Sequence, residues 1–291
     1  MYKYGIFYGY WIRNWEVDLE ELKNYVAKVD ELGFDIIELS CDIVDQFSSS
    51  ERQELKSEGE RRGINFTFNT NLNQNNDISS EEEEARRRGI RHLENSIKLI
   101  DEMDGEVLTG LTYGAWNPSF QGDFEEKMSY FDRSVESWRQ VIKTAEDYDV
   151  KCTVEVVNRF EQFILNTAAE GIEFVERVDS PNLGILLDTY HMNIEEDSIP
   201  EAIEKAGDKL FHLHVGENNR KPPGRGGHIQ WDSIRKALDK IDFGRGIVME
   251  PFLLSGGEVG SSIGVWRGLS EGKDLDEEVR KSLEFLKRKL E

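Results

Sequence analysis

Short runs of apolar residues alternate with longer amphipathic segments along almost the whole chain. The apolar runs have strand length, and they predict strands at 3–8, 35–40, 65–69, 106–112, 151–157, 183–188, 210–215 and 246–250. The amphipathic segments predict helices at 19–32, 50–62, 80–103, 125–148, 168–178, 199–206, 231–240 and 276–290. Strict alternation of strand and helix is the pattern of a (β/α)8 barrel. We therefore predict an α/β protein with one such domain over residues 1–291.

Local signals support several of these boundaries. Gly33 and Gly63 follow the first two helices, as C-terminal stops do. Ser79 and Ser80 precede a run of four glutamates, which predicts a helix start there because the helix dipole favours acids at its N-terminus. The longest irregular segments, 113–123 and 251–272, each follow a strand. In a barrel both would lie on the face that carries the active site.

The charge balance narrows the class of partner. The chain has 36 basic and 58 acidic residues, a net charge of −22. An acidic surface repels phosphate backbones and anionic membranes, so we expect no nucleic acid or membrane partner. A neutral sugar meets no such barrier. The acidity is equally compatible with a salty habitat or a sequence tuned for solubility.

The chain has no stretch of 18 apolar residues and no basic start followed by an apolar run. We therefore expect a soluble, cytoplasmic protein. The two cysteines, Cys41 and Cys152, sit in apolar segments of a cysteine-poor chain. We predict buried free thiols rather than a disulfide.

Four predicted strands each deliver one metal-type ligand at their ends: Glu155, Asp188, His214 and Glu250. They are separated by 33, 26 and 36 residues, roughly one barrel unit each. Parallel strands in a barrel bring such ends to one point. Three carboxylates would repel one another there without a cation, and together with one imidazole they suit a divalent metal such as Mn²⁺, Co²⁺ or Mg²⁺.

Alternation along a strand separates ligands from core residues. His212 shares a face with His214 but lies one layer deeper, so we interpret it as a core or supporting histidine rather than a ligand. Taken singly, each acid could be an ion-pair partner or a helix cap. Four at consecutive strand ends favour a metal site.

Around these ligands the chain resembles the ketose 3-epimerases, the D-tagatose 3-epimerase and D-allulose (D-psicose) 3-epimerase group of xylose-isomerase-like barrels. The resemblance spans nearly the whole chain and is most specific in the C-terminal half. The matching stretches are Gly5–Tyr8 with Tyr10 and Trp11, Lys28–Asp35, Glu155–Glu161, Leu187–Glu196, His212–Arg220, Pro223–Gly226 with Trp231, Val248–Phe252 and Gly264–Gly268.

The resemblance implies one divalent metal per subunit, most readily Mn²⁺ or Co²⁺, held by the four strand-end residues. It also implies that Glu155 and Glu250 form the acid/base pair. The residues that it places around the substrate are Glu161, His191, Arg220, Trp116 and Phe7. The chain departs from the pattern at Phe7, where many relatives have tyrosine, and at 69–72, where relatives are usually glycine-rich. Both positions lie near the distal end of the sugar, so they bear on substrate preference.

Epimerisation at C3 of a 2-ketose removes a proton from one face and returns one to the other. A divalent ion would polarise the C2 carbonyl and stabilise the enediolate, while two flanking carboxylates exchange the protons. We expect Glu155 and Glu250 to bind the metal through one oxygen each, which leaves the other free. D-fructose/D-allulose, D-tagatose/D-sorbose and L-ribulose/L-xylulose are candidate pairs.

Three other functions remain open. An aldose–ketose isomerase of the same superfamily would typically need a second metal, and the sequence shows no obvious ligand set beyond the four. A barrel endonuclease would need more histidines than the five present and a basic groove. A non-catalytic sugar-binding barrel would not need carboxylates on both sides of its ligand.

The resemblance also implies a homodimer or homotetramer assembled through the catalytic-face side. The glycine-rich segment Ser255–Gly264, with Trp266, is a candidate contact region, with a mobile loop as the alternative.

Overall fold

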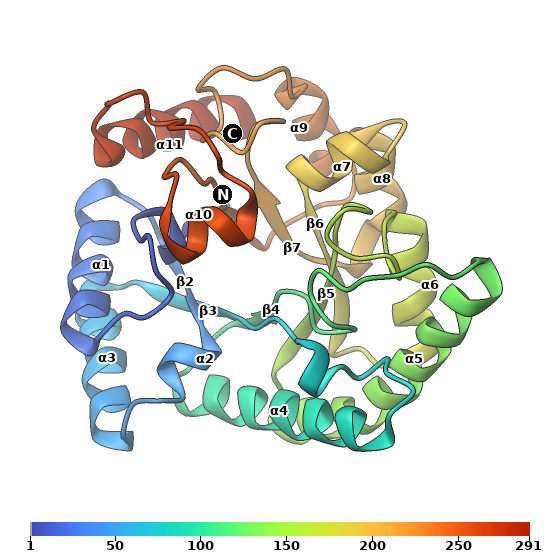
Figure 1. Ribbon diagram of the computed structural model, residues 1–291. Coiled ribbons are helices and arrows are strands. Elements are labelled where there is room, and N and C mark those ends of the chain that lie inside the picture. The colour runs from blue at the N-terminus through green and yellow to red at the C-terminus, as the bar shows by residue number, and fades with distance from the viewer. Residues whose placement is uncertain (1) are drawn as a thin grey trace.

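The computed structural model describes residues 2–291 and confirms the (β/α)8 barrel. Within that range eight parallel strands close in chain order into a single barrel (Figure 1). The strands are β1 (Lys3–Phe7), β2 (Ile36–Ser40), β3 (Asn65–Asn69), β4 (Val107–Thr109), β5 (Lys151–Val156), β6 (Leu183–Asp188), β7 (Leu210–Val215) and β8 (Gly246–Met249). Each overlaps a predicted apolar run.

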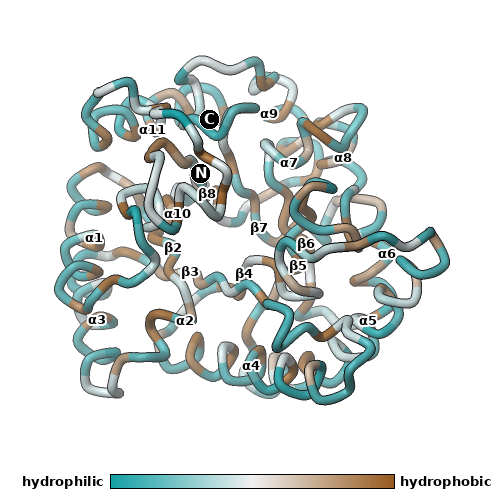
Figure 2. Tube along the Cα trace, in the orientation of Figure 1, coloured by the Kyte–Doolittle hydropathy of each residue, from teal (hydrophilic) through white to brown (hydrophobic). Residues whose placement is uncertain are grey.

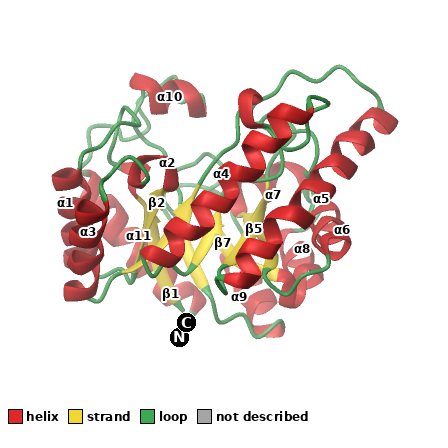
Figure 3. Cartoon of the chain, turned by 90° about the horizontal axis from the view of Figure 1, so that it is seen from below, coloured by secondary structure: helices red, strands yellow, loops and turns green. Residues whose placement is uncertain are grey.

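A ring of helices surrounds the strands, seen from the side in Figure 3. The helices that match predicted segments are α1 (Leu19–Leu32), α3 (Ser49–Arg62), α4 (Glu83–Glu102), α5 (Phe124–Asp147), α6 (Ala168–Val178), α8 (Ile199–Ala206), α9 (Trp231–Lys240) and α11 (Leu275–Leu290). Gly33 and Gly63 end α1 and α3 in the left-handed conformation, at φ +84° and +69°, as their positions predicted.

Sequence patterning missed three short helices. These are α2 (Cys41–Val44), α7 (Thr189–Glu195) and α10 (Gly257–Ile263), which follow β2, β6 and β8. The 3-10 turns Tyr8–Tyr10, Gln74–Asn76 and Gly207–Lys209 were missed as well. Segments this short carry too few residues to set up a helical period. The three helices all follow strands, so they lie on the face where the strand ends deliver the candidate site.

Two predicted boundaries were too generous. The fourth strand ends at Thr109, three residues early, because Gly110 turns the backbone to φ +94°. A Cβ at Gly110 would lie 2.5 Å from the carbonyl oxygen of Thr70, so only glycine fits this crossing. Helix α4 starts at Glu83 rather than Ser80, and Glu82 at its N-cap makes no side-chain cap.

Apolar side chains fill the space between barrel and helices, and the most hydrophilic positions lie on the outer helices (Figure 2). Cys41 and Cys152 are buried and free, as predicted. Across residues 2–291 no helix is both long and apolar enough to span a membrane.

Candidate active site

The structure brings the four predicted ligands to one point at the carboxyl end of the barrel. Asp188 on β6 lies level with His214 on β7, and Val248 on β8 is the next partner of His214. Glu155 comes from β5, and Glu250 directly follows β8, where its backbone N–H donates to the carbonyl of Val215. Each position is set by strand register, because neighbouring parallel strands fix which residues reach the same level.

One atom from each of the four residues lies within 4.8 Å of the others. His214 Nδ1 is 3.7 Å from Glu155 Oε1 and 3.9 Å from Glu250 Oε1. That nitrogen is buried, and no described residue offers it a hydrogen bond. A buried ring nitrogen without a partner, facing carboxylates, is the arrangement expected of a metal ligand.

The charges of this group also fit a cation. Burial raises the pKa of the Glu250 carboxyl well above its ordinary value; His214 opposes the rise, and the charge of Glu155 adds to it. A divalent ion would offset the repulsion between these carboxylates. Hard carboxylate oxygens with one imidazole suit Mn²⁺, Co²⁺ or Mg²⁺, so the residues present fit the predicted metal.

A second buried cluster lies beneath the first, and its carboxylate, Glu38, was not among the residues predicted from the sequence. Glu38 on β2 is fully buried, with its carboxylate 3.0 Å from His214 Nε2 and 3.3 Å from His212 Nε2. Thr67 donates a hydrogen bond of 2.9 Å to the same carboxylate. Burial opposes ionisation of Glu38, but the two imidazoles lower the pKa of its carboxyl below the ordinary range.

This cluster corrects the expectation that no further ligand set exists, because Glu38, His212 and His214 could also hold an ion by residue type. It shares His214 with the first group and is closed off in the barrel interior. Its contacts are those of a supporting carboxylate behind a ligating histidine, an arrangement that commonly fixes which ring nitrogen faces the metal. His212 takes the deeper, supporting position predicted for it.

Three predicted substrate-binding residues form one network beside the ligands. Arg220 Nη2 lies 3.3 Å from Glu161 Oε1 and 3.1 Å from His191 Nε2. The backbone N–H of Asn158 donates to His191 Nδ1 at 3.2 Å, and His191 Nε2 lies 3.8 Å from Glu155 Oε1. Burial opposes ionisation of Glu161, but Arg220 and then His191 lower its pKa to about 2.

The backbone holds Arg220 in place. Its φ is +59°, an uncommon conformation for a residue with a side chain, and its N–H and C=O bond to Glu217 and Phe252. The guanidinium lies 4.3 Å from the ring centre of Tyr190 and 5.2 Å from that of Phe252. Backbone and rings together fix the direction of a buried cation.

A cavity of about 310 Å³ opens above the ligands. It lies at the small end of the roughly 300–1,000 Å³ typical of ligand pockets. Phe7, Trp116, Glu155, Glu161, His191, Arg220 and Glu250 line it, whereas Asp188 and His214 lie buried beneath its floor. The structure thus brings every predicted site residue to this cavity or its floor. Trp116 also lies within 3.5 Å of Glu161 through its indole nitrogen.

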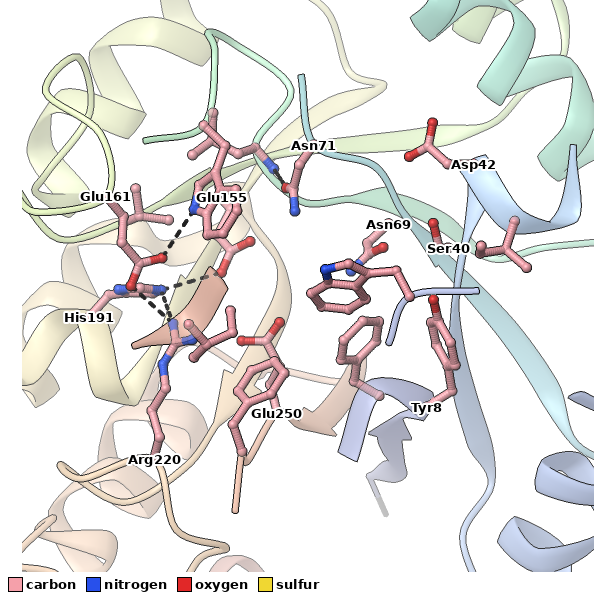
Figure 4. Close-up of a pocket in the computed structure, with 18 residues that line it drawn as sticks. Tyr8, Ser40, Asp42, Asn69, Asn71, Glu155, Glu161, His191, Arg220 and Glu250 are labelled. Carbon is pink, nitrogen blue, oxygen red and sulfur yellow. Dashed lines mark hydrogen bonds and ion pairs between the residues drawn. The ribbon is translucent and has the colours of Figure 1, made fainter. Parts of the chain in front are cut away.

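Most of the opposite wall was not among the predicted substrate-binding residues, although the segment 69–72 was expected near the distal end of the sugar. Tyr8, Ser40, Asp42, Asn69 and Asn71 line the cavity across from the charged network (Figure 4). All follow or end the first three strands, and that position is the signal that could have singled them out. The remaining missed lining residues are Trp15, Ile43, Leu111, Val157, Phe252 and Ile263.

The fold and site define the class: an α/β barrel with a buried His/carboxylate group, able to hold a metal ion, at the floor of a small-molecule cavity. Residues 26–289 match the family described as Xylose isomerase-like TIM barrel, and the chain belongs to that family. This confirms the membership inferred from the motifs.

Named relatives are similar over almost their full length. The chain is 41% identical to the D-psicose 3-epimerase of Ruminiclostridium cellulolyticum, over 99% of this chain and 98% of the relative. It is 37% identical to the D-psicose 3-epimerase of Agrobacterium fabrum, over 97% of each. The crystal structure of D-psicose 3-epimerase with D-tagatose from Clostridium cellulolyticum H10 superimposes with a TM-score of 0.95, at 41% identity and 99% coverage of both chains.

Proposed function

We propose that this protein is a divalent-metal-dependent ketose 3-epimerase. The observation that carries the proposal is the placement of Glu155 and Glu250, which reach one cavity from two different strand ends with the unpartnered Nδ1 of His214 near both. The similarity to named sugar 3-epimerases over the full chain supports the reaction type.

In this proposal Glu155, Asp188, His214 and Glu250 hold the metal, with Mn²⁺ or Co²⁺ as the first candidates. When bound, the ion supplies positive charge beside the C2 carbonyl and so acidifies the C3 proton. Glu155 and Glu250 then act on opposite faces of the sugar: one carboxylate accepts the C3 proton, and the other, protonated beforehand, donates its own proton to C3 from the other side. The roles reverse in the reverse reaction.

The charged network orients the reacting end. Arg220 offers a fork of donors that suits ketose oxygens, with Glu161 and His191 beside it. Trp116 supplies an apolar wall that limits water around the reacting carbon, and Phe7 supplies one toward the distal end of the sugar. Exclusion of water favours return of the proton from a carboxylic acid rather than from solvent.

The test is turnover with product analysis. Metal-loaded protein should interconvert D-fructose and D-allulose, or another pair of C3 epimers, and incorporate solvent deuterium at C3. An aldose product would instead support an aldose–ketose isomerase. Turnover of neither kind would exclude both enzymes and leave a sugar-binding barrel.

We also propose a homodimer or homotetramer. Trp266 is 78% exposed and Phe160 is 75% exposed, which is high for large apolar side chains. Trp266 follows α10, in the region expected to make the contact. Light scattering of the metal-loaded protein should give a multiple of 33.6 kDa, and a monomeric mass would overturn this proposal.

A further inference from the structure

The wall formed by the ends of β1, β2 and β3 carries polar side chains among its apolar ones, yet these polar groups take no part in the charged network. Tyr8, Ser40, Asp42, Asn69 and Asn71 lie there, across the cavity from Arg220 and His191 (Figure 4). If the reacting carbons lie near Glu155 and Glu250, the remaining carbons of an extended sugar must run toward this wall. The inference therefore rests on the function proposed above.

Tyr8 is the first sign that the wall binds something. Its side chain is fully buried, and its hydroxyl forms no hydrogen bond of good geometry with a described residue, although the Ser40 hydroxyl lies close enough to oppose the rise that burial causes in the pKa of the phenol. A buried hydroxyl without a partner costs free energy, so native proteins rarely leave one unless a ligand or water completes it. Tyr8 lines the cavity, where a ligand hydroxyl could supply that bond.

Asp42 is a hydrogen-bond acceptor whose carboxylate is held in position by its neighbours. Its carboxylate receives a hydrogen bond of 3.1 Å from Thr70, while His92 on α4 lies 3.6 Å behind it and 2.8 Å from the same threonine oxygen. The side chain is 50% exposed. Since an ionised carboxylate only accepts hydrogen bonds, its free lone pairs suit ligand hydroxyls and repel anions.

Asn71 complements Asp42. Its side-chain oxygen accepts a hydrogen bond of 2.9 Å from the backbone N–H of Leu111, which leaves its NH2 group as the donor. One wall thus offers an acceptor from Asp42, a donor from Asn71 and a hydroxyl from Tyr8. These groups match sugar hydroxyls, which both donate and accept hydrogen bonds. The wall contains no cation, because Arg220 is the single lysine or arginine among the described residues that line the cavity.

We infer that Tyr8, Asp42 and Asn71 form a tail subsite that binds the C5 and C6 hydroxyls of unphosphorylated ketohexoses and rejects their 6-phosphates. Asp42 contributes most in both respects. It accepts a hydroxyl hydrogen bond, and its negative charge opposes a terminal phosphate. The subsite thus sets substrate choice and leaves the proton transfers to the opposite wall.

The experiment compares wild type, Asp42→Asn and a matched control, Asp45→Asn. Asp45 is exposed, three residues along, and does not line the cavity. Each Mn²⁺-loaded protein is assayed for kcat/KM on D-fructose, 6-deoxy-D-fructose and D-fructose 6-phosphate. Direct binding of the same three sugars is measured by calorimetry.

Wild type should prefer D-fructose to the 6-deoxy sugar by about tenfold, the usual effect of one hydrogen bond to a charged group. Asp42→Asn should reduce that preference to about twofold. It should also raise kcat/KM for D-fructose 6-phosphate by about tenfold relative to that for D-fructose. The control should behave as wild type.

If the wild-type protein had the same kcat/KM for D-fructose and the 6-deoxy sugar, the proposed subsite would be wrong. It would also be wrong if Asp42→Asn lowered kcat/KM by the same factor on all three sugars. The calorimetric data separate this result from failure of the epimerase proposal. If no sugar were turned over but the protein still bound D-fructose more tightly than the other two sugars, the proposed reaction would be excluded and the subsite would stand.

Discussion

The two halves of the barrel mouth are built differently. Around β5 to β8, ionisable side chains contact one another: Arg220, Glu161 and His191 form one network, and His214 lies between two glutamates. Around β1 to β3, each polar side chain is anchored separately or has no partner, as Asp42 and Tyr8 illustrate. When side chains bond to one another, substitution of one disturbs the others. Residues that are anchored separately can be substituted one at a time.

In the proposed epimerase, that difference would assign the reaction to one half of the barrel mouth and substrate choice to the other. The interdependent half fits a fixed chemical step, in which misplacement by an ångström is costly. The independent half fits selection among similar sugars. Activity and metal binding should therefore respond to changes in the half around β5 to β8, and substrate range to changes in the half around β1 to β3.

Removal of the metal should have the largest effect. Dialysis against a chelator should lower C3 epimerisation by at least about a thousandfold, because the charge that acidifies the C3 proton is lost. Mn²⁺ or Co²⁺ should restore activity and raise the Tm, since an ion that binds only the folded state stabilises it. Titration should give one ion per chain. Full activity in the chelated protein would show that the half around β5 to β8 does not need a metal for the reaction, and the proposed division of roles between the two halves would then be wrong.

Glu250→Gln should lower kcat by about 10²- to 10⁴-fold, the usual contribution of a positioned acid or base. The amide keeps the shape but cannot carry the proton. Glu284→Gln on the exposed side of α11 is the matched control and should match wild type. Circular dichroism and a metal titration establish that the variant is folded and loaded. Retained turnover in that loaded variant would show that Glu250 is not part of the acid/base pair.

Glu38→Gln should weaken Mn²⁺ binding by about 10- to 100-fold, the usual effect of removing the partner behind a ligating histidine. It would leave the imidazoles of His212 and His214 without their carboxylate. Calorimetry measures the Kd directly. Thr67→Val removes the hydroxyl that bonds Glu38 but keeps the charge, so its effect should be smaller. An unchanged Kd in Glu38→Gln would assign Glu38 to packing alone.

Trp116→Phe should have the smallest effect, about a threefold rise in KM with kcat nearly unchanged. The ring wall remains, and only the weak 3.5 Å contact from the indole nitrogen to Glu161 is lost. Steady-state kinetics on D-fructose measure both constants. A large fall in kcat would place Trp116 with the interdependent half.

The convergence of the four candidate metal ligands was predictable because each ends an apolar run, and strand ends in a barrel converge whatever the intervening sequence. Glu38 was not predictable in the same way. It lies inside an apolar strand, and only closure of β2 and β7 around the same interior brings it against His214. Asp42 was missed because α2, which carries it, has only four residues and no readable period.

Asp188 has two contacts with separate consequences. One of its oxygens accepts the backbone N–H of Tyr190 and so starts α7, the helix that carries His191. An ion held by Asp188 would therefore restrain the segment that positions His191. Thermodynamic linkage makes such an effect reciprocal. A sugar that orders α7 raises the affinity for the ion by the same factor by which the ion raises the affinity for the sugar. Metal retention should thus rise with sugar concentration, so the enzyme would hold its ion best while it is working.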